Sequence, residues 1–339
     1  MINFSESVGL AAKVVSKQSY AKALIPLKKP DNDFATAFAP SNIALCKYWG
    51  KSNLELNLPS TPSLSISLGN RGSEVKISIS SHNSLSINGK DVPYESIAFK
   101  RTFDFVGLLT TDDAKLSIQS VNNIPTAAGL ASSASYFAAL TLALDKLHNW
   151  QVPLSTLSCL ARLGSGSACR SLYQGFVQWV GCVDPWQSYG VPLNIQWPDF
   201  RIGLLIFDGK EKTISSRQAM LHTQLTSPIY NSWCENSYKD FAIMHEAIEE
   251  KNFQKLGETA EYNALSLHAV MLSARPAIIY SQPSTLESIA KVHALRKNGV
   301  QLYLTQDAGP NLKLMFLKDD LEVVLNVFTG LEVIEPIWA

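Results

Sequence analysis

Residues 122–134, Asn-Asn-Ile-Pro-Thr-Ala-Ala-Gly-Leu-Ala-Ser-Ser-Ala, have the composition of a loop that binds phosphate. Gly129 lets the backbone approach a ligand closely because it carries no Cβ atom. Ser132 and Ser133 can cap a helix expected over about residues 134–147, whose free N–H groups and positive dipole end favour an anion. The stretch lacks both the Gly-Lys-Ser/Thr ending of a Walker loop and the three spaced glycines of a dinucleotide site. Taken alone, it fits an ordinary capped helix equally well.

Two lysines lie four residues apart in the apolar stretch 39–51, with Tyr48 between them. If this stretch is extended, Lys47, Trp49 and Lys51 share one face, because successive side chains of a strand point to opposite sides. A single lysine would normally be an exposed surface residue. Two ammonium groups on one face of an apolar segment instead predict a site for a doubly anionic ligand.

Residues 164–171, Gly-Ser-Gly-Ser-Ala-Cys-Arg-Ser, place a guanidinium beside a run of small residues. Arg170 can make two-pronged contacts with a carboxylate or a phosphate. Gly-Ser-Gly-Ser is more often a linker, but apolar and aromatic residues flank it here on both sides. The stretch therefore indicates an anion site.

Asp307 lies in the loop 305–311, Thr-Gln-Asp-Ala-Gly-Pro-Asn, between strand-like runs at 300–304 and 312–316. Asp, Gly, Pro and Asn are all turn formers, so a plain hairpin turn is one interpretation. The other is a carboxylate held at a strand end, with the Gly-Pro pair that follows restricting the direction of the loop.

The composition fits a globular chain of two domains without a general affinity for nucleic acid. It has 339 residues, 46% of them hydrophobic, and 29 basic residues balance 29 acidic ones. A nucleic-acid-binding protein normally has a basic excess. The five cysteines and six histidines are scattered without zinc-site spacing, so we expect free thiols in a reducing cytosol and no metal site built from these residues. The longest apolar run, residues 136–144, is shorter than the about 20 residues that span a bilayer.

The hydrophobic patterns predict mixed helices and strands. The predicted strands are residues 63–68 and 75–79, each with one face in water, and 85–87, 201–207, 300–304 and 312–316. Asn88-Gly89 predicts a tight turn after 85–87. Residues 238–274 read as a long helical stretch, and 284–297 as a helix with Ser284 and Glu287 at capping-box spacing and Gly299 as its stop.

Together the four motifs resemble the diphosphomevalonate decarboxylase family, a branch of the superfamily of galactokinase, homoserine kinase, mevalonate kinase and phosphomevalonate kinase. The resemblance runs from about Thr36 to about Asp319. It implies an α+β, two-lobed small-molecule kinase fold with the active site in the cleft between the lobes. Tyr136 departs from the family, which usually has a glycine at this position.

The expected organisation is an N-terminal extension at 1–34, a domain with the phosphate-binding loop at 35–198, and a C-terminal α+β domain at 199–339. Residues 1–29 lack the apolar core and cleavage site of a secretory signal. We expect a variable cytosolic extension here in preference to an organelle transit sequence.

The resemblance implies ATP-dependent decarboxylation of mevalonate 5-diphosphate to isopentenyl diphosphate through phosphorylation of the 3-hydroxyl, a lyase step of the mevalonate pathway in isoprenoid and lipid biosynthesis. Asp307 would take or steer the proton of that hydroxyl, as a base or through its charge. Lys47 would keep Asp307 ionised and stabilise the transferring phosphoryl group. Arg170 would hold the substrate carboxylate.

The same resemblance implies two sets of binding residues. The substrate would be bound by Tyr48, Lys51, Ser165, Gly166, Ser167 and Arg170. ATP would be bound by Pro125, Ala128, Gly129, Leu130, Ala131, Ser132, Ser133, Ser215 and Ser216. Mg2+ would be held through the ATP phosphates, with Ser133 as a candidate contact and no other protein ligand. For Ser215 and Ser216, a helix cap is an equal alternative.

A cytoplasmic homodimer with no nucleic-acid or membrane partner is implied as well. Two other functions stay open on the sequence alone. One is a kinase of this fold that stops at the 3-phosphate, or an enzyme that uses mevalonate with one phosphate or none, because the number of phosphates depends mainly on Tyr48 and Lys51. The other is a non-catalytic nucleotide-binding protein, which the presence of both Asp307 and Arg170 disfavours.

Overall fold

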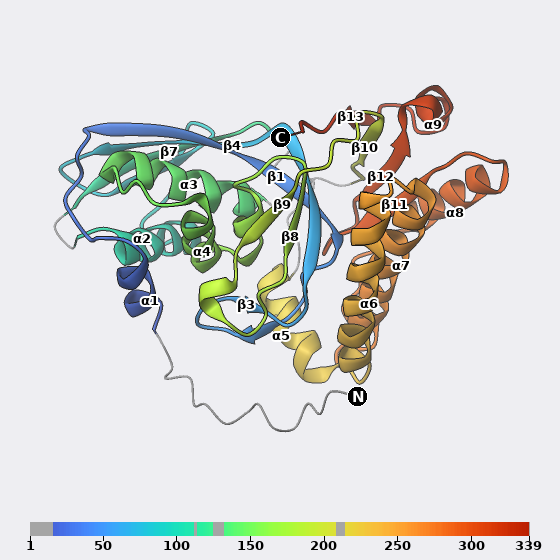
Figure 1. Ribbon diagram of the computed structural model, residues 1–339, viewed down its shortest axis with the longest axis horizontal. Coiled ribbons are helices and arrows are strands. Elements are labelled where there is room, and N and C mark those ends of the chain that lie inside the picture. The colour runs from blue at the N-terminus through green and yellow to red at the C-terminus, as the bar shows by residue number, and fades with distance from the viewer. Residues whose placement is uncertain (1–15, 112–113, 125–131, 208–213, 339) are drawn as a thin grey trace.

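The chain forms two lobes that lie side by side in the computed structural model, which describes residues 16–111, 114–124, 132–207 and 214–338 (Figure 1). The first lobe is built on a large sheet with the strand order β6-β5-β7-β4-β8-β9, in which β1 also pairs with β4. These strands are β1 (Phe34–Cys46), β4 (Ser63–Ile79), β5 (Ser84–Ile87), β6 (Lys90–Asp91), β7 (Leu116–Asn122), β8 (Phe176–Trp179) and β9 (Gly190–Leu193).

The two long strands β1 and β4 run antiparallel and carry the rest of this sheet. Along the edge opposite β1, β4 pairs with β8 over its first part and with β7 over its second part. The two strands predicted at 63–68 and 75–79 are thus one strand. The prediction of a wet face is correct for the second part, where buried and exposed residues alternate, and wrong for 63–68, where all six residues are buried.

In the described part of the chain, the first lobe has the helices α1 (Lys17–Leu24), α2 (Ile97–Leu109), α3 (Ser132–His148) and α4 (Leu154–Gly164). They share a core with the sheet, in which Leu140 and Leu144 of α3 join Ile77 and Ile118. The helix predicted at 134–147 is confirmed as α3. The predicted tight turn between β5 and β6 is confirmed too, with φ angles of 51° at Asn88 and 74° at Gly89.

Tyr136 points from α3 toward α2. Its hydroxyl lies 3.0 Å from the hydroxyl of Thr102, and its ring contacts that of Phe137. The side chain is therefore accommodated between the two helices.

The second lobe packs helices against a smaller sheet with the order β11-β12-β10-β13. Its strands are β10 (Phe200–Leu205), β11 (Tyr303–Gln306), β12 (Leu312–Leu317) and β13 (Glu332–Ile334). Its helices are α5 (Ser216–Thr226), α6 (Tyr230–Glu249), α7 (Phe253–Leu272), α8 (Pro283–Lys297) and α9 (Leu321–Val327). The described residues also form a small hairpin, β2 (Lys51–Asn53) with β3 (Leu58–Pro59), and three short 3-10 helices, η1 (Gly166–Arg170), η2 (Pro185–Gln187) and η3 (Lys318–Asp320).

Two helix predictions need correction. The stretch 238–274 is two helices, because Lys251 has a φ of 52° and the side chain of Asn252 caps the start of α7. The helix at 284–297 begins one residue earlier with Pro283 at its first position, so Gln282 is its N-cap and Ser284 is not. Proline suits the first position because its missing N–H would have no partner there.

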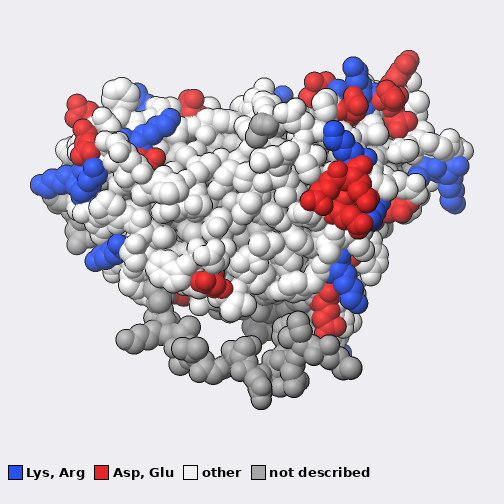
Figure 2. Space-filling model, in the orientation of Figure 1, with Lys and Arg blue, Asp and Glu red and all other residues white. Residues whose placement is uncertain are grey.

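An apolar core joins the lobes. Ile43 and Leu64 of the large sheet belong to the same buried cluster as Phe200, Met244 and Tyr303 of the second lobe. Figure 2 shows a largely uncharged face over the large sheet, with acidic side chains gathered over the junction of α6 and α7. Among the described residues, no helix combines the length and hydropathy needed to cross a bilayer. The predicted boundary at 198/199 falls between β9 and β10.

Candidate active site

Asp307 stands directly after β11, in the turn that leads into β12. The N–H group of Gly309 donates to the Asp307 carbonyl oxygen at 2.7 Å, and the side chain of Gln306 donates to the Gly309 carbonyl oxygen at 2.9 Å. These contacts fix the turn. The carboxylate is therefore held at the end of a strand by a loop with internal hydrogen bonds. The same loop is the hairpin turn between β11 and β12, so both interpretations of the sequence are confirmed.

Two lysines hold the Asp307 carboxylate. The Nζ atom of Lys47 lies 2.7 Å from Oδ1, and that of Lys313 lies 3.0 Å from Oδ2. Both lysine side chains are 2% exposed, whereas that of Asp307 is 26% exposed and can meet a ligand. Two ammonium groups against one carboxylate leave the cluster with one excess positive charge, which suits a phosphoryl group in transfer.

The lysines determine the ionisation of Asp307. Burial alone would raise the pKa of its carboxyl group, but the charges of Lys313 and Lys47 outweigh this and hold the pKa well below its ordinary value. Burial also lowers the pKa of Lys47, and the Asp307 charge opposes that shift. The carboxylate is thus ionised at neutral pH, and its low pKa makes it a weak base.

Side chains of helix α7 hold the backbone of Lys47 and of Asp307 in place. The Asn263 side chain accepts the backbone N–H of Lys47 at 2.8 Å, and its amide donates to Asp240 at 2.9 Å. One turn further along α7, Nε2 of His268 lies 3.2 Å from the Asp307 carbonyl oxygen. Burial lowers the pKa of His268 to about 4, so the ring is neutral at pH 7 and donates its N–H to that oxygen.

Arg170 is a fully buried cation at the end of η1. Its Nε donates to Ser65 Oγ at 2.9 Å, Nη1 donates to Ser63 Oγ, and Nη2 donates to Asn42 Oδ1 at 3.4 Å. The guanidinium also lies over the ring of Trp179. A guanidinium has five N–H groups, so these three bonds leave donors at Nη1 and Nη2 for a ligand.

Tyr48 lies against the Gly-Ser-Gly-Ser run. Its ring packs on Trp179 with centroids 4.9 Å apart, and its hydroxyl is buried without a hydrogen-bond partner among the described residues. A Cβ atom on Gly166 would approach that hydroxyl to 2.5 Å, so this position requires glycine. A buried hydroxyl without a protein partner favours a contact with a bound ligand.

The start of α3 meets the same run. The Ser133 hydroxyl lies 3.3 Å from that of Ser165, which lies 3.5 Å from that of Ser167. Ser132 opens α3. The other predicted residues of the phosphate-binding loop, Pro125, Ala128, Gly129, Leu130 and Ala131, lie outside the described residues.

The second predicted serine pair forms a helix start. Ser215 caps α5 and forms a capping box with Gln218, and Ser216 is the first residue of the helix. The helix-cap interpretation is therefore confirmed for Ser215. A contact of either serine with a nucleotide stays a prediction.

The shared face of Lys47, Trp49 and Lys51 required residues 47–51 to be extended, and the structure does not meet this condition. Strand β1 ends at Cys46, and Gly50 has a φ of 93°, a left-handed turn that glycine adopts readily. The two lysines consequently have separate partners, since Lys51 Nζ donates to Asn57 Oδ1 at 2.6 Å. Trp49 donates from its ring to Thr223 of α5.

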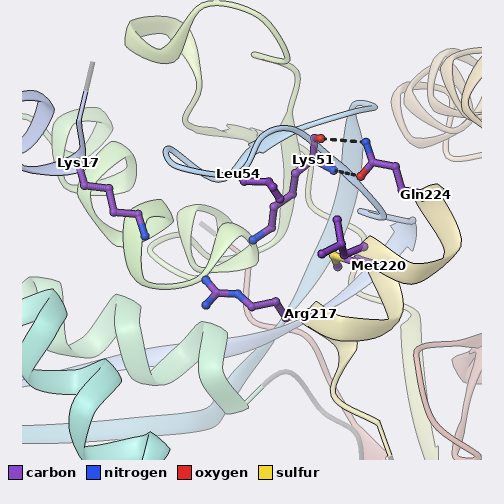
Figure 3. A pocket seen from close by; sticks show the side chains of 7 residues that line it. Lys17, Lys51, Leu54, Arg217, Met220 and Gln224 are labelled. Atoms are coloured by element: carbon purple, nitrogen blue, oxygen red, sulfur yellow. Dashed lines mark hydrogen bonds between the residues drawn. The ribbon is translucent and has the colours of Figure 1, made fainter. Parts of the chain in front are cut away.

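Lys51 lines a cavity of about 240 Å³ between the β2–β3 hairpin and α5 (Figure 3). The other lining residues are Lys17, Leu54, Arg217, Met220, Leu221 and Gln224. Burial lowers the pKa of Lys51 to about 8, and the charges of Arg217, Lys17 and Arg101 act in the same direction. A bound anion would therefore stabilise the protonated form of Lys51.

The sequence interpretation missed Lys313 and Arg217. Lys313 gave a usable signal, because it is a lone charge inside the apolar strand 312–317. Arg217 directly follows the predicted serine pair, but this motif is typical of a helix start. The sequence contained no signal that the Arg217 side chain would lie near Lys51.

Two family models match most of the chain. The model of the diphosphomevalonate decarboxylase-like N-terminal domain matches residues 39–189, and that of the mevalonate 5-diphosphate decarboxylase C-terminal domain matches residues 202–334. A diphosphomevalonate decarboxylase of Candida albicans is 36% identical over 86% of this chain and 87% of its own length.

Solved structures agree in fold. Mevalonate diphosphate decarboxylase from Staphylococcus aureus aligns with a TM-score of 0.85 and 32% identity, over 91% of this chain and 96% of its own. The complex of MDDEF with MVAPP, AMPPCP and magnesium aligns with a TM-score of 0.82 and 35% identity, over 90% of this chain and 97% of its own.

Proposed function

The chain belongs to the diphosphomevalonate decarboxylase family, and we propose that its Lys47, Asp307 and Lys313 cluster carries out the chemistry of that family. The reaction is the ATP-dependent decarboxylation of mevalonate 5-diphosphate to isopentenyl diphosphate, with release of ADP, phosphate and carbon dioxide. The relatives and the solved complex favour it over a kinase that stops at the 3-phosphate. The carboxylate held between two buried ammonium groups is the observation that carries the assignment of residues.

The first step transfers the terminal phosphoryl group of ATP to the tertiary 3-hydroxyl. Asp307 accepts a hydrogen bond from this hydroxyl and orients its oxygen toward the phosphorus, and its low pKa favours this role over that of a full base. As the new O–P bond forms, the bond from the phosphorus to ADP breaks and the hydroxyl proton passes to an oxygen of the transferred phosphoryl group. Lys47 and Lys313 keep Asp307 ionised, and their excess charge stabilises the negative charge of the transferring group.

The second step breaks the bond between C3 and the phosphate oxygen, while the electron pair of the C1–C2 bond forms the C2=C3 double bond and carbon dioxide leaves. Arg170 holds the carboxylate through its remaining N–H donors until that bond breaks. Ser63, Ser65 and Asn42 fix the plane of the guanidinium for this contact.

The diphosphate end of the substrate binds at Lys51, Tyr48 and the Ser165 to Ser167 run. The buried Tyr48 hydroxyl and the lowered pKa of Lys51 support this placement. The cavity is smaller than the range of about 300–1,000 Å³ typical of whole-ligand sites, which fits a subsite for one anionic group.

ATP and Mg2+ bind at the start of α3. The Ser133 hydroxyl in the first turn of this helix lies 3.3 Å from that of Ser165, and a helix N-terminus favours phosphate. Each Asp307 oxygen has an ammonium partner, so the ATP phosphates would be the main ligands of Mg2+, and Ser133 would be the candidate protein contact. When bound, Mg2+ neutralises phosphate charge during transfer.

We further propose a cytoplasmic homodimer with the domains divided near residue 198. The five cysteines are all free, which supports a reducing compartment. The family resemblance supports the dimer.

We expect purified protein to release equal amounts of carbon dioxide, phosphate and ADP from mevalonate 5-diphosphate with ATP and Mg2+. A coupled assay for ADP together with trapped carbon dioxide measures this, with mevalonate 5-phosphate and mevalonate as comparison substrates. ADP formation without carbon dioxide would contradict the decarboxylase assignment and support the kinase. A preference for the monophosphate would contradict the diphosphate assignment.

We expect kcat/KM for mevalonate 5-diphosphate to fall as pH rises above about 8. Lys51 has a pKa of about 8 in the free enzyme and attracts the diphosphate only when protonated, whereas the substrate phosphates are already ionised at lower pH. In the Lys51→Arg variant, kcat/KM should stay constant up to about pH 9, since arginine stays protonated. An unchanged alkaline limb in that variant would exclude Lys51 as its origin.

A further inference from the structure

Helix α1 is an integral part of the first lobe although it precedes the region matched by the family model, which begins at residue 39. Tyr20 and Ala21 are fully buried, and Ile25 is 3% exposed in the same core as α3 and α4. The N–H of Lys17 donates to the side chain of Glu55, in the turn of the β2–β3 hairpin, at 3.2 Å. The helix is thus attached both to the core and to the hairpin.

A buried arginine connects α1 to Lys51. Arg162 donates to the Tyr20 hydroxyl at 2.8 Å and to the Leu56 carbonyl oxygen in the hairpin at 3.0 Å. The next residue, Asn57, donates to the Arg162 carbonyl oxygen at 2.8 Å and accepts from Lys51 Nζ at 2.6 Å. The position of α1 and the position of the Lys51 ammonium are therefore set by one continuous network.

Lys17 extends from the first turn of α1 into the cavity that Lys51 lines. Figure 3 shows Lys17, Lys51 and Arg217 pointing toward one another from three separate elements, α1, β2 and α5. Three cations and no carboxylate stand among the described residues that line this cavity. Cations brought together in this way repel one another unless an anion lies between them.

Acids near Lys17 offset part of this charge, Glu55 most strongly, but no acid stands among the described residues that line the cavity. Burial lowers the pKa of Lys17, and Arg217 and Arg101 act in the same direction, while Glu55 and Asp104 oppose them. Glu55 is exposed, and its carboxylate accepts the backbone N–H of Lys17, so it stands beside the helix start outside the cavity lining.

We infer that Lys17 is a specificity-determining residue, which contributes a third cation to the subsite for the diphosphate group and favours a diphosphate over a monophosphate. The inference depends on the proposed function, which places the diphosphate at Lys51. A second phosphate adds negative charge and oxygen acceptors, and Lys17 supplies a donor from an element outside the family domain.

The test compares Lys17→Met with Lys22→Met, which removes the other, exposed lysine of α1. We expect Lys17→Met to raise KM for mevalonate 5-diphosphate about fivefold to tenfold with kcat and KM for ATP within twofold of wild type, and Lys17→Glu to raise it further. Lys17→Arg should restore KM, and Lys22→Met should leave it unchanged. A KM within twofold of wild type in both Lys17→Met and Lys17→Glu, or an equal rise in Lys22→Met, would overturn the inference.

Calorimetric titration with Mg2+-free inorganic pyrophosphate and with inorganic phosphate tests the subsite without turnover. Lys17→Met should weaken pyrophosphate binding by the same factor and phosphate binding by less than twofold. Equal loss for both anions would overturn the specificity role. A wild-type protein that releases no carbon dioxide would instead refute the proposed function, and the titration would still report whether Lys17 binds the second phosphate.

Discussion

Asp307→Asn is expected to abolish turnover while binding of ATP and mevalonate 5-diphosphate persists. Asparagine has nearly the same shape, but it removes the negative charge that orients the 3-hydroxyl and raises the charge of the cluster beside the buried Lys47 and Lys313. Loss of one preorganised electrostatic contact to the reacting group costs about 10²–10³ in rate. Because the interaction is made in the chemical step, the loss should appear in kcat.

Single-turnover measurement of carbon dioxide release, with nucleotide and substrate titrations, checks this expectation. The exposed Asp319→Asn serves as the matched control for the change of charge. Asp307→Glu keeps the charge on a longer arm and should retain part of the rate. Activity of Asp307→Asn within a factor of a few of wild type would remove Asp307 from the chemistry.

The sequence predicted the pairing of Lys47 with Asp307 because both lie in motifs that resemble the family. Their separation of 260 positions meant that no local pattern could show the contact. The contact depends on β1 ending beside the β11–β12 turn. That arrangement arises from the apolar core shared by the lobes.

The alternating Ser-Leu-Ser-Ile-Ser-Leu run misled the prediction for a physical reason. Serines at every second position normally indicate a face in water. Here Ser63 and Ser65 accept hydrogen bonds from the guanidinium of Arg170, and Ser67 donates a hydrogen bond to Gln174. The polar face is therefore buried, and its serine side chains still have hydrogen-bond partners. An alternating pattern shows that a face is polar and cannot show whether water or a buried cation satisfies it.

Lys313 was missed because its role depends on strand register. Thr305 of β11 pairs with Lys313 of β12, and this register carries Lys313 to the side of Asp307, two residues past Thr305. The break at Lys251 and the docking of α1 were missed similarly, since a positive φ at lysine and a buried Tyr20–Arg162 contact leave no periodic signal.

Lys313→Met is expected to lower kcat about 10²-fold, the loss typical when one preorganised electrostatic contact is removed. It should also change the pH profile. Lys313 is the stronger of the two charges that lower the Asp307 pKa, so its removal raises that pKa. The ionised carboxylate is needed and is lost as pH falls through this pKa, so the acid limb of kcat should move to higher pH.

The shift of the acid limb separates a role through Asp307 from a general loss of structure. Lys313→Arg keeps the positive charge and should keep the limb near its wild-type position, and Lys318→Met removes an exposed lysine just past the same strand and should change neither rate nor profile. A lysine that only filled the core would lower stability without moving the limb. Lys313→Met with a wild-type pH profile would therefore show that Lys47 alone controls the ionisation of Asp307.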